Sequence, residues 1–338
     1  MALFRCRHCG HLREVAQEHI GKQAKCPQCR EVSPIYDTLL FIEKIVEQIM
    51  VLQKELAALR QSTSPPDHLE MEVVDRPGEE YVSLQDIDIH NTTVLATSEQ
   101  YAPIVDWFAQ KQMQASVDQK ELDTTGFFDE VALELGNEYD VFGKIGEKIR
   151  RAHTKGYTNL NFPLAQESQK NIQKITSFFS QLYTYSFIAK YFYQKKEKIA
   201  HISLQTSPAI VQFFQGSWLE WFIFIKLANI LQEKQLPFSG TRRMNIRFAN
   251  EDTHELDAVF LINQSILLCI ECKSGEFRRD LDKLQRLRSR MQMAPEHFLL
   301  CVAGLNEEQA RGLSSMYEMT VTNEKSIFEH VEQLLTCT

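Results

Sequence analysis

The pattern of apolar and polar positions is most regular in the last third of the chain. Residues 255–262 and 266–273 are rich in Leu, Ile, Val and Phe and flank Asn-Gln-Ser at 263–265, which predicts two strands joined by a three-residue loop. Further elements are predicted around this hairpin: a helix over residues 218–234, a strand over 244–248, a helix over 280–293 and a strand over 297–303. The predicted order is helix, three strands, helix, strand.

A second periodic stretch lies nearer the N-terminus. Its apolar side chains fall at alternating spacings of 3 and 4, at Ile42, Ile45, Ile49, Leu52, Leu56 and Leu59. This a/d heptad pattern predicts a coiled-coil helix over 37–60 and a homodimer formed through residues 42–59. A helix that packs on its own chain is the alternative, because about three heptads are close to the shortest coiled coil.

Two segments of different composition separate these stretches. Residues 61–93 lose periodicity and carry eight acidic residues against one arginine, which is typical of an acidic flexible linker. Residues 94–215 are predicted to form a helical middle domain, in which the aromatic-rich residues 172–193 favour a pair of core helices over a base-stacking platform. Four basic side chains there either contact phosphate groups or form a solvated face: Lys144, Lys148, Arg150 and Arg151.

Composition narrows the class of protein. The chain has 338 residues, of which 43% are hydrophobic and 24% charged, as expected for a soluble protein of two or three modules. It has no apolar run near the roughly 20 residues of a membrane span and no hydrophobic signal region, so we expect a cytoplasmic protein without membrane contact. The net charge of −8 does not by itself favour nucleic-acid binding, but the distribution of charge matters more than the sum.

Positive charge is concentrated in and before the predicted helix over 280–293. Residues 273–290 hold seven Lys or Arg against three acidic residues. Four of these basic residues have spacings of 4, 3 and 4 and share one helix face: Arg279, Lys283, Arg286 and Arg290. Such a face suits a phosphate backbone, and an ordinary solvated amphipathic helix would show the same pattern.

The predicted hairpin gathers two carboxylates and an ammonium group. Its three-residue loop pairs Ile262 with Ile266 and sets Asp257 opposite Glu271, while side-chain alternation puts Glu271 and Lys273 on one face. Two neighbouring carboxylates repel each other unless a hard divalent cation lies between them. A lysine beside that cation can orient or deprotonate a water, which suits hydrolysis of a phosphodiester. The alternative is a surface ladder of cross-strand ion pairs.

Three segments carry a resemblance to a known family: Gly-Ser-Trp-Leu-Glu at 216–220, Glu-Leu-Asp at 255–257 and Ile-Glu-Cys-Lys-Ser-Gly at 270–275. With the predicted order of elements, they resemble the PD-(D/E)XK nuclease superfamily, and in detail the nuclease domain of the ancillary CRISPR nucleases that cyclic oligoadenylates switch on. The resemblance extends from about Phe213 to the C-terminus. Those nucleases carry a Rossmann-like sensor ahead of the nuclease domain. Other modules precede it in this chain, so the cyclic-oligoadenylate trigger is not carried over.

The resemblance implies roles for individual residues. Asp257 and Glu271 would bind Mg²⁺ or Mn²⁺ with Lys273 acting beside them. Glu220 matches the carboxylate of the first helix that often completes the catalytic site. Glu220 also has a structural interpretation, because Ser217 and Glu220 have the spacing of a capping box that begins a helix.

The first thirty residues contain the pairs Cys6-x-x-Cys9 and Cys26-x-x-Cys29. A spacer of 16 residues lets the two pairs meet one ion, which predicts a Cys₄ site for a structural Zn²⁺ in a zinc ribbon over 1–33. Metal binding would supply most of the folding energy of so short a segment. Three histidines are alternative ligands: His8, His11 and His19. Zinc ribbons bind nucleic acid or protein or have a purely structural role, and the sequence leaves these alternatives open.

The sequence thus predicts a multi-domain α/β protein. Its modules, in order, are a zinc ribbon (1–33), a coiled-coil helix (37–60), an acidic linker (61–93), a helical middle domain (94–215) and an αβββαβ restriction-endonuclease-like domain (216–338). The expected function is metal-dependent endonucleolytic hydrolysis of DNA, with RNA as a second candidate substrate, in prokaryotic defence against phage or foreign nucleic acid. A partner protein of a defence system is also expected. The alternative is a nucleic-acid sensor or scaffold that keeps a nuclease fold without using its chemistry.

Overall fold

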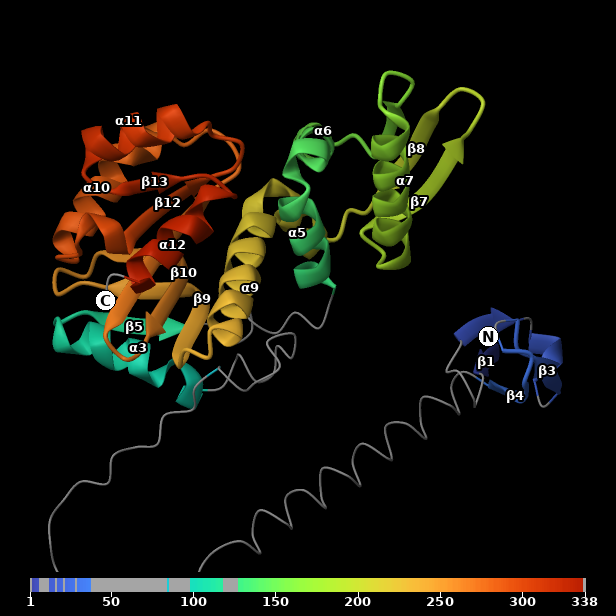
Figure 1. Ribbon diagram of the computed structural model, residues 1–338, viewed down its shortest axis with the longest axis horizontal. Helices are drawn as coiled ribbons and strands as arrows, with labels where there is room; N and C mark the ends of the chain where they lie inside the picture. The colour runs from blue at the N-terminus through green and yellow to red at the C-terminus, as the bar shows by residue number, and fades with distance from the viewer. Residues whose placement is uncertain are drawn as a thin grey trace, which may run out of the picture. The chain divides into compact units, whose positions relative to one another are not determined.

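The computed structural model describes residues 2–5, 12–15, 17–20, 22–27, 29–37, 84, 98–117 and 127–336. The chain divides into two compact units, Met1–Pro77 and Gly78–Thr338 (Figure 1). The predicted coiled-coil helix and nearly all of the predicted linker lie outside the described residues, so both stay predictions, as does the homodimer. No described helix is long and apolar enough to cross a membrane.

The N-terminal unit contains a small antiparallel sheet in the order β2-β1-β4-β3. Its elements are β1 (Ala2–Arg5), β2 (Leu12–Val15), the 3-10 helix η1 (Gln17–His19), β3 (Gln23–Lys25) and β4 (Val32–Asp37). Among the described residues of this unit, Phe4, Cys26 and Ile35 form a buried apolar cluster.

A six-stranded sheet in the order β13-β12-β11-β10-β9-β5 forms the centre of the C-terminal unit. Its strands are β5 (Gln114–Val117), β9 (Phe238–Arg247), β10 (Thr253–Ile262), β11 (Ile266–Lys273), β12 (Phe298–Val302) and β13 (Thr320–Thr322). Neighbouring strands from β5 to β11 are antiparallel, and β11, β12 and β13 are parallel. The carboxyl ends of the three parallel strands therefore lie at one edge of the sheet.

The predicted order of elements in the nuclease-like region is confirmed, but the first strand is longer than predicted, because β9 begins at Phe238 rather than at Met244. Ile262 pairs with Ile266, so the predicted hairpin register is correct. The preceding helix is α9 (Trp218–Glu233), and α10 (Leu281–Arg290) lies between β11 and β12. The 3-10 turns η4 (Arg278–Asp280) and η5 (Pro295–His297) flank α10. Two further helices follow β12, α11 (Glu307–Tyr317) and α12 (Ser326–Thr336).

The prediction of a helical middle domain over 94–215 is wrong in part, because this region contains strands as well as helices. Its described elements are α3 (Ser98–Gln110), β5, α5 (Phe128–Asn137), α6 (Tyr139–Lys155), β6 (Asn159–Pro163), α7 (Gln169–Thr184), β7 (Ile188–Gln194), β8 (Ile199–Leu204), α8 (Pro208–Gln212) and the π-helix η3 (Phe213–Ser217). Strands β6, β8 and β7 form a separate antiparallel sheet. Residues 172–193 are thus a helix followed by a strand rather than two helices, and β5 joins the six-stranded sheet.

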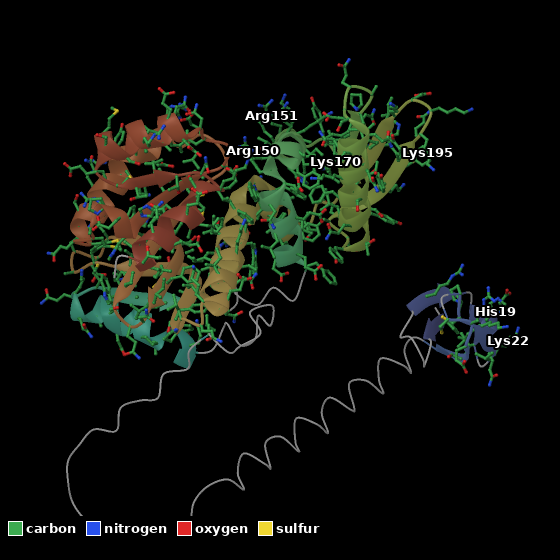
Figure 2. All side chains as sticks on the ribbon, in the orientation of Figure 1. His19, Lys22, Arg150, Arg151, Lys170 and Lys195 are labelled. Atoms are coloured by element: carbon green, nitrogen blue, oxygen red, sulfur yellow. The ribbon has the colours of Figure 1, made fainter. Side chains whose placement is uncertain are left out.

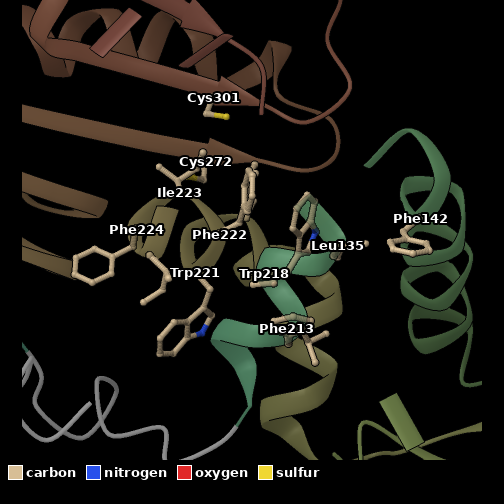
Figure 3. Packing of buried hydrophobic residues seen from close by; sticks show 14 of the residues in the cluster. Leu135, Phe142, Phe213, Trp218, Trp221, Phe222, Ile223, Phe224, Cys272 and Cys301 are labelled. Atoms are coloured by element: carbon tan, nitrogen blue, oxygen red, sulfur yellow. The ribbon is translucent and has the colours of Figure 1, made fainter. Parts of the chain in front are cut away.

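Helix α9 connects the six-stranded sheet to the middle region. It is apolar on nearly all sides, as expected for a helix buried on both faces. Figure 3 shows α9 with Trp221 and Phe222, with Cys272 and Cys301 of the sheet on one side of the helix and Leu135 and Phe142 of α5 and α6 on another. The opposite face of the sheet packs on α3, α10 and α11. Helix α9 therefore joins the sheet, which carries the predicted catalytic residues, to the middle region.

Candidate active site

In strand β9, the alternation of side chains between the two faces of the sheet reverses beside the predicted site. Arg243 has a left-handed backbone, with φ of 52°, which is uncommon for a residue other than glycine. Phe238 packs on the α9 side of the sheet, whereas Met244, six residues later, packs on the opposite side. Regular pairs on both sides of this interruption set Arg243 against Asp257 of β10. The irregular backbone thus lies at the predicted carboxylate.

The structure brings the three predicted hairpin residues together. The Nζ atom of Lys273 lies 3.9 Å from Oε2 of Glu271, as expected for side chains two residues apart on one strand. The main-chain N–H of Cys272 donates a hydrogen bond of 2.7 Å to Oδ2 of Asp257, which ties the two strands at this point. Glu271 is only 3% exposed. The alternative of a solvent-exposed ladder of ion pairs is therefore wrong.

Burial shifts the pKa values of both carboxyl groups upward. The pKa of Asp257 is raised well above its usual value by burial and by the charges of Glu271 and Glu220, against the effect of Lys273. Burial raises the pKa of Glu271 to about 8, although Lys273 and Lys283 act in the opposite direction. Burial alone would lower the pKa of Lys273, but Asp257 and Glu271 raise it above its usual value. Strongly shifted groups around a cavity are typical of functional sites.

Glu220 points toward the same site and does not cap its helix. Ser217 makes no side-chain capping bond and has helical backbone angles, so the capping-box interpretation is wrong. The carboxylate of Glu220 instead accepts a hydrogen bond of 3.1 Å from Nε of Arg243, and its Oε2 lies 3.9 Å from Nη1 of Arg242. Two arginines therefore hold Glu220, and their charge compensates for its partial burial.

A cavity of about 360 Å³ opens above these residues. Its lining includes Glu220, Arg243, Asp257 and Lys273 of the nuclease-like region and Arg150 of α6. Figure 2 shows Arg150 on α6 in the middle region. A Cβ atom at Gly275 would lie 2.7 Å from Nη1 of Arg150, so a side chain at this position would displace the guanidinium group from the cavity wall.

The basic side chains predicted as a cluster on α6 make different contacts. Arg150 lines the cavity and also lies 4.0 Å from Glu147, Arg151 pairs with Glu147, and Lys148 donates a hydrogen bond of 2.5 Å to the main-chain oxygen of Asn161. The sequence signalled the cluster, but only the packing of α6 shows which member reaches the site.

His254 is a site residue that the sequence reasoning missed. Its Nε2 atom lies 3.2 Å from Oε1 of Glu271. Burial and then the nearby charge of Lys283 lower the pKa of His254 to about 4, so the imidazole is neutral at physiological pH. The neutral imidazole can therefore orient the Glu271 carboxylate without competing with a bound metal ion for that carboxylate. His254 lies three residues before Asp257 on the same strand. Regular alternation would place these two side chains on opposite faces, so the sequence did not indicate that they share a site.

The donor set fits a hard divalent cation with few protein ligands. One oxygen of Asp257 accepts the Cys272 N–H and Oε1 of Glu271 contacts His254. The other Asp257 oxygen and Oε2 of Glu271, which lies 3.9 Å from Lys273 Nζ, are the oxygens that could contact a cation beside the lysine. Among the described residues, no three or more His, Cys, Asp and Glu side chains converge on one point. Mg²⁺ commonly takes one or two carboxylates, several waters and substrate phosphates, so these residues fit Mg²⁺.

The predicted basic face of α10 is exposed. Leu281, Leu284 and Leu287 are buried, and the four basic residues lie on the solvent side: Arg279, Lys283, Arg286 and Arg290. Arg290 is committed to a local contact, since its Nη1 lies 2.8 Å from Oδ2 of Asp252. Lys283 is close enough to lower the pKa of Glu271. Binding of phosphate to this face stays a prediction.

Half of the predicted zinc site lies within the described residues. Cys26 and Cys29 occupy the turn between β3 and β4, where the Arg30 N–H donates a hydrogen bond of 3.0 Å to the Cys26 oxygen. Cys6 and Cys9 lie outside the described residues. They follow β1, which pairs with β4. The zinc site and its four ligands stay predictions.

The comparisons agree with this geometry. A buried acidic pair with its lysine, on the second and third strands of an αβββαβ unit, characterises a PD-(D/E)XK-like nuclease domain. Residues 208–293 match the family described as Card1-like, endonuclease domain. The match supports a PD-(D/E)XK-like nuclease domain in this part of the chain. No curated protein is similar enough to the chain to count as a match.

Two solved structures are similar to the chain at low sequence identity. One is the crystal structure of protein VC1899 from Vibrio cholerae, with 14% identity, a TM-score of 0.47, and coverage of 68% of this chain and 60% of that chain. The other is Can2 from Sulfobacillus thermosulfidooxidans in complex with cyclic tetra-adenylate, with 15% identity, a TM-score of 0.48, and coverage of 68% and 59%. The matched region thus spans about 60% of the length of each of those proteins.

Proposed function

We propose that the chain is a metal-dependent endonuclease that hydrolyses phosphodiester bonds, with DNA as the first candidate substrate and RNA as the second. The observation that carries this proposal is the convergence of Asp257, Glu271 and Lys273 inside residues that match a Card1-like endonuclease domain. Mg²⁺ or Mn²⁺ held by Asp257 and Glu271 would acidify a water and neutralise phosphate oxygens. Lys273 orients the attacking water or holds the phosphate.

The remaining cavity residues have supporting roles in this proposal. Arg150 contacts a phosphate of the bound strand from the α6 side, and Glu220 positions Arg243. A guanidinium group suits phosphate because it presents several donors in a fixed plane. Phosphates farther along the strand contact the exposed face of α10, through Arg279, Lys283 and Arg286.

The N-terminal modules target and dimerise the enzyme in this proposal. Cys6, Cys9, Cys26 and Cys29 hold one structural Zn²⁺, and the helix over 42–59 joins two chains. Similarity of the nuclease domain to ancillary CRISPR nucleases supports a role in prokaryotic defence, together with a partner protein. The activating signal acts through the middle region or that partner.

A cleavage screen tests the proposal directly. Purified protein is incubated with plasmid DNA, single-stranded DNA and RNA in the presence of Mg²⁺, Mn²⁺ or a chelator. We expect cleavage of at least one substrate with metal and none with chelator. Asp257→Ala should abolish it, and the exposed Asp106→Ala on α3 should not. Absence of cleavage of all three substrates with both metals would favour the sensor or scaffold hypothesis.

A further inference from the structure

The sheet formed by β6, β8 and β7 has one covered face and one open face. Helix α7 packs on the covered face, where the Phe179 ring lies 5.0 Å from Phe162 and 5.7 Å from Tyr191. Alternate residues point to the other face. The strand register arranges them in two rows across the three strands: Asn161, His201 and Phe192 in one, and Asn159, Ser203 and Lys190 in the other.

An exposed aromatic ring lies at the end of the first row. Phe192 is 63% exposed, and its ring centroid lies 6.2 Å from that of His201 at an interplanar angle of 25°. Cross-strand hydrogen bonds hold the polar neighbours: His201 Nδ1 lies 2.8 Å from Asn161 Oδ1, and the Ser203 hydroxyl donates to Asn159 Oδ1 at 2.7 Å. The face therefore presents the exposed Phe192 ring and a hydrogen-bonded imidazole beside two hydrogen-bonded amide groups.

These side chains line a cavity of about 510 Å³, together with Tyr183, Tyr191 and Ile202. This volume lies within the usual range of about 300–1,000 Å³ for sites that hold a small organic group. Tyr183 is itself 53% exposed and adds a second accessible aromatic ring at the rim. A planar group can thus lie against Phe192 and His201 while the amides contact its edge.

Positive charge surrounds this face. Residues 186–206 contain four lysines and one acidic residue: Lys190, Lys195, Lys196, Lys198 and Glu197. Three of the lysines lie in the exposed turn between β7 and β8, where Figure 2 shows Lys195. Lys148 of α6 contacts the Asn161 main chain at the other edge. The ligand complementary to the face has planar groups and negative charge.

We propose that this open sheet face binds single-stranded nucleic acid, with a base stacked on Phe192 and His201 and phosphates paired with the lysines of the β7–β8 turn. Stacking requires bases that are not already paired in a duplex, so a single strand is favoured over a double strand. The site is separate from the cavity at Lys273. It shares with the proposed function only the chemical class of its ligand.

Binding without cleavage tests this proposal. Fluorescence anisotropy is measured with the full chain, a chelator, and a labelled oligothymidylate of about 12 nucleotides, beside a duplex of the same length. Aromatic stacking of a base is worth about 1–3 kcal/mol, so Phe192→Ala should weaken binding by roughly 5- to 150-fold. Phe192→Tyr should retain affinity. Tyr157→Ala is the matched control, because Tyr157 is 61% exposed and does not line the cavity.

The salt dependence tests the phosphate contacts. The double variant Lys195→Ala with Lys196→Ala should reduce the slope of log affinity against log salt by about 1.4, which corresponds to two lost contacts on a single strand. Unchanged affinity in Phe192→Ala, or tighter binding of the duplex, would overturn the proposal. A change of mass in Phe192→Ala by light scattering, with oligonucleotide binding intact, would assign the face to self-association. The effect of Asp257→Ala is measured in the separate cleavage assay. Failure of the proposed nuclease activity would therefore leave the binding result for Phe192→Ala unaffected.

Discussion

Substitution of Gly136 by alanine tests how the middle region is held against the nuclease domain. Gly136 lies in α5, and an added Cβ atom there would lie 2.3 Å from Cδ2 and 2.4 Å from Cγ of Phe222 in α9. Ordinary contacts between carbon atoms are about 3.5–4.0 Å. The Phe222 ring is fully buried, and it packs edge-on against Phe328 with centroids 5.6 Å apart. One of the two helices must therefore move by more than about 1 Å.

Two opposing effects set the size of the change in the free energy of unfolding. Alanine in a helix interior is favoured over glycine by about 1 kcal/mol, whereas overpacking of a core costs about 1–3 kcal/mol. Because the clash involves the ring atom nearest the backbone, the upper end of that cost applies. We expect the variant to lose about 2 kcal/mol of unfolding free energy. At a urea m-value of about 3 kcal/mol/M, the transition midpoint falls by about 0.7 M.

Urea unfolding followed by tryptophan fluorescence measures this change, since Trp218 and Trp221 lie in α9. Gly312→Ala in α11 is the control, because nothing lies within 4 Å of its added Cβ atom. That variant should gain up to about 1 kcal/mol. The double variant Gly136→Ala with Phe222→Leu should recover part of the loss through coupling between the two sites. A Gly136→Ala protein as stable as the Gly312→Ala protein would refute the packing of α5 on α9.

Three further predictions concern the other modules. Arg150→Ala should raise KM for nucleic acid by roughly tenfold or more, because a hydrogen bond to a charged group contributes about 1.5–3 kcal/mol; steady-state cleavage measures it, and an unchanged KM would remove Arg150 from the substrate site. Wild-type protein should contain one Zn²⁺ per chain by elemental analysis and Cys26→Ser should lose it; a zinc-free wild type would count against the ribbon. Ile49→Asp should convert a dimer to a monomer in light scattering, since a buried carboxylate without a partner is costly, and an unchanged mass would remove the coiled coil.

Sequence patterns predicted the αβββαβ unit well because its strands are long and its hairpin loop is short. A three-residue loop sets the register, so pairing of Ile262 with Ile266 could be read directly. The reversal of alternation at Arg243 could not be predicted, because it depends on a left-handed residue in the middle of a strand. His254 and Arg150 approach the site through this irregularity and through helix packing, and neither is a feature of local sequence.

The strands of the middle region could not be predicted from the sequence, for a different reason. In β7 the aromatic side chains of Tyr191 and Tyr193 alternate with the exposed Phe192, so both faces of the strand carry aromatic residues and its period of two is hidden. Strand β5 is only four residues long, and it pairs with β9 more than 100 residues later along the chain. Pairing at that separation leaves no local signal in the sequence.

The division of labour between Asp257 and Lys273 tests the central claim most directly. Calorimetric titration with Mn²⁺ is carried out on both alanine variants beside a cleavage assay. Lys273→Ala should lower cleavage by at least about 10²-fold while Mn²⁺ affinity stays unchanged or rises slightly, because Lys273 acts beside the cation without holding it. Asp257→Ala should lose both cleavage and Mn²⁺ binding. Full cleavage by Lys273→Ala, or wild-type Mn²⁺ affinity in Asp257→Ala, would contradict the assignment of this site as a metal-dependent nuclease centre.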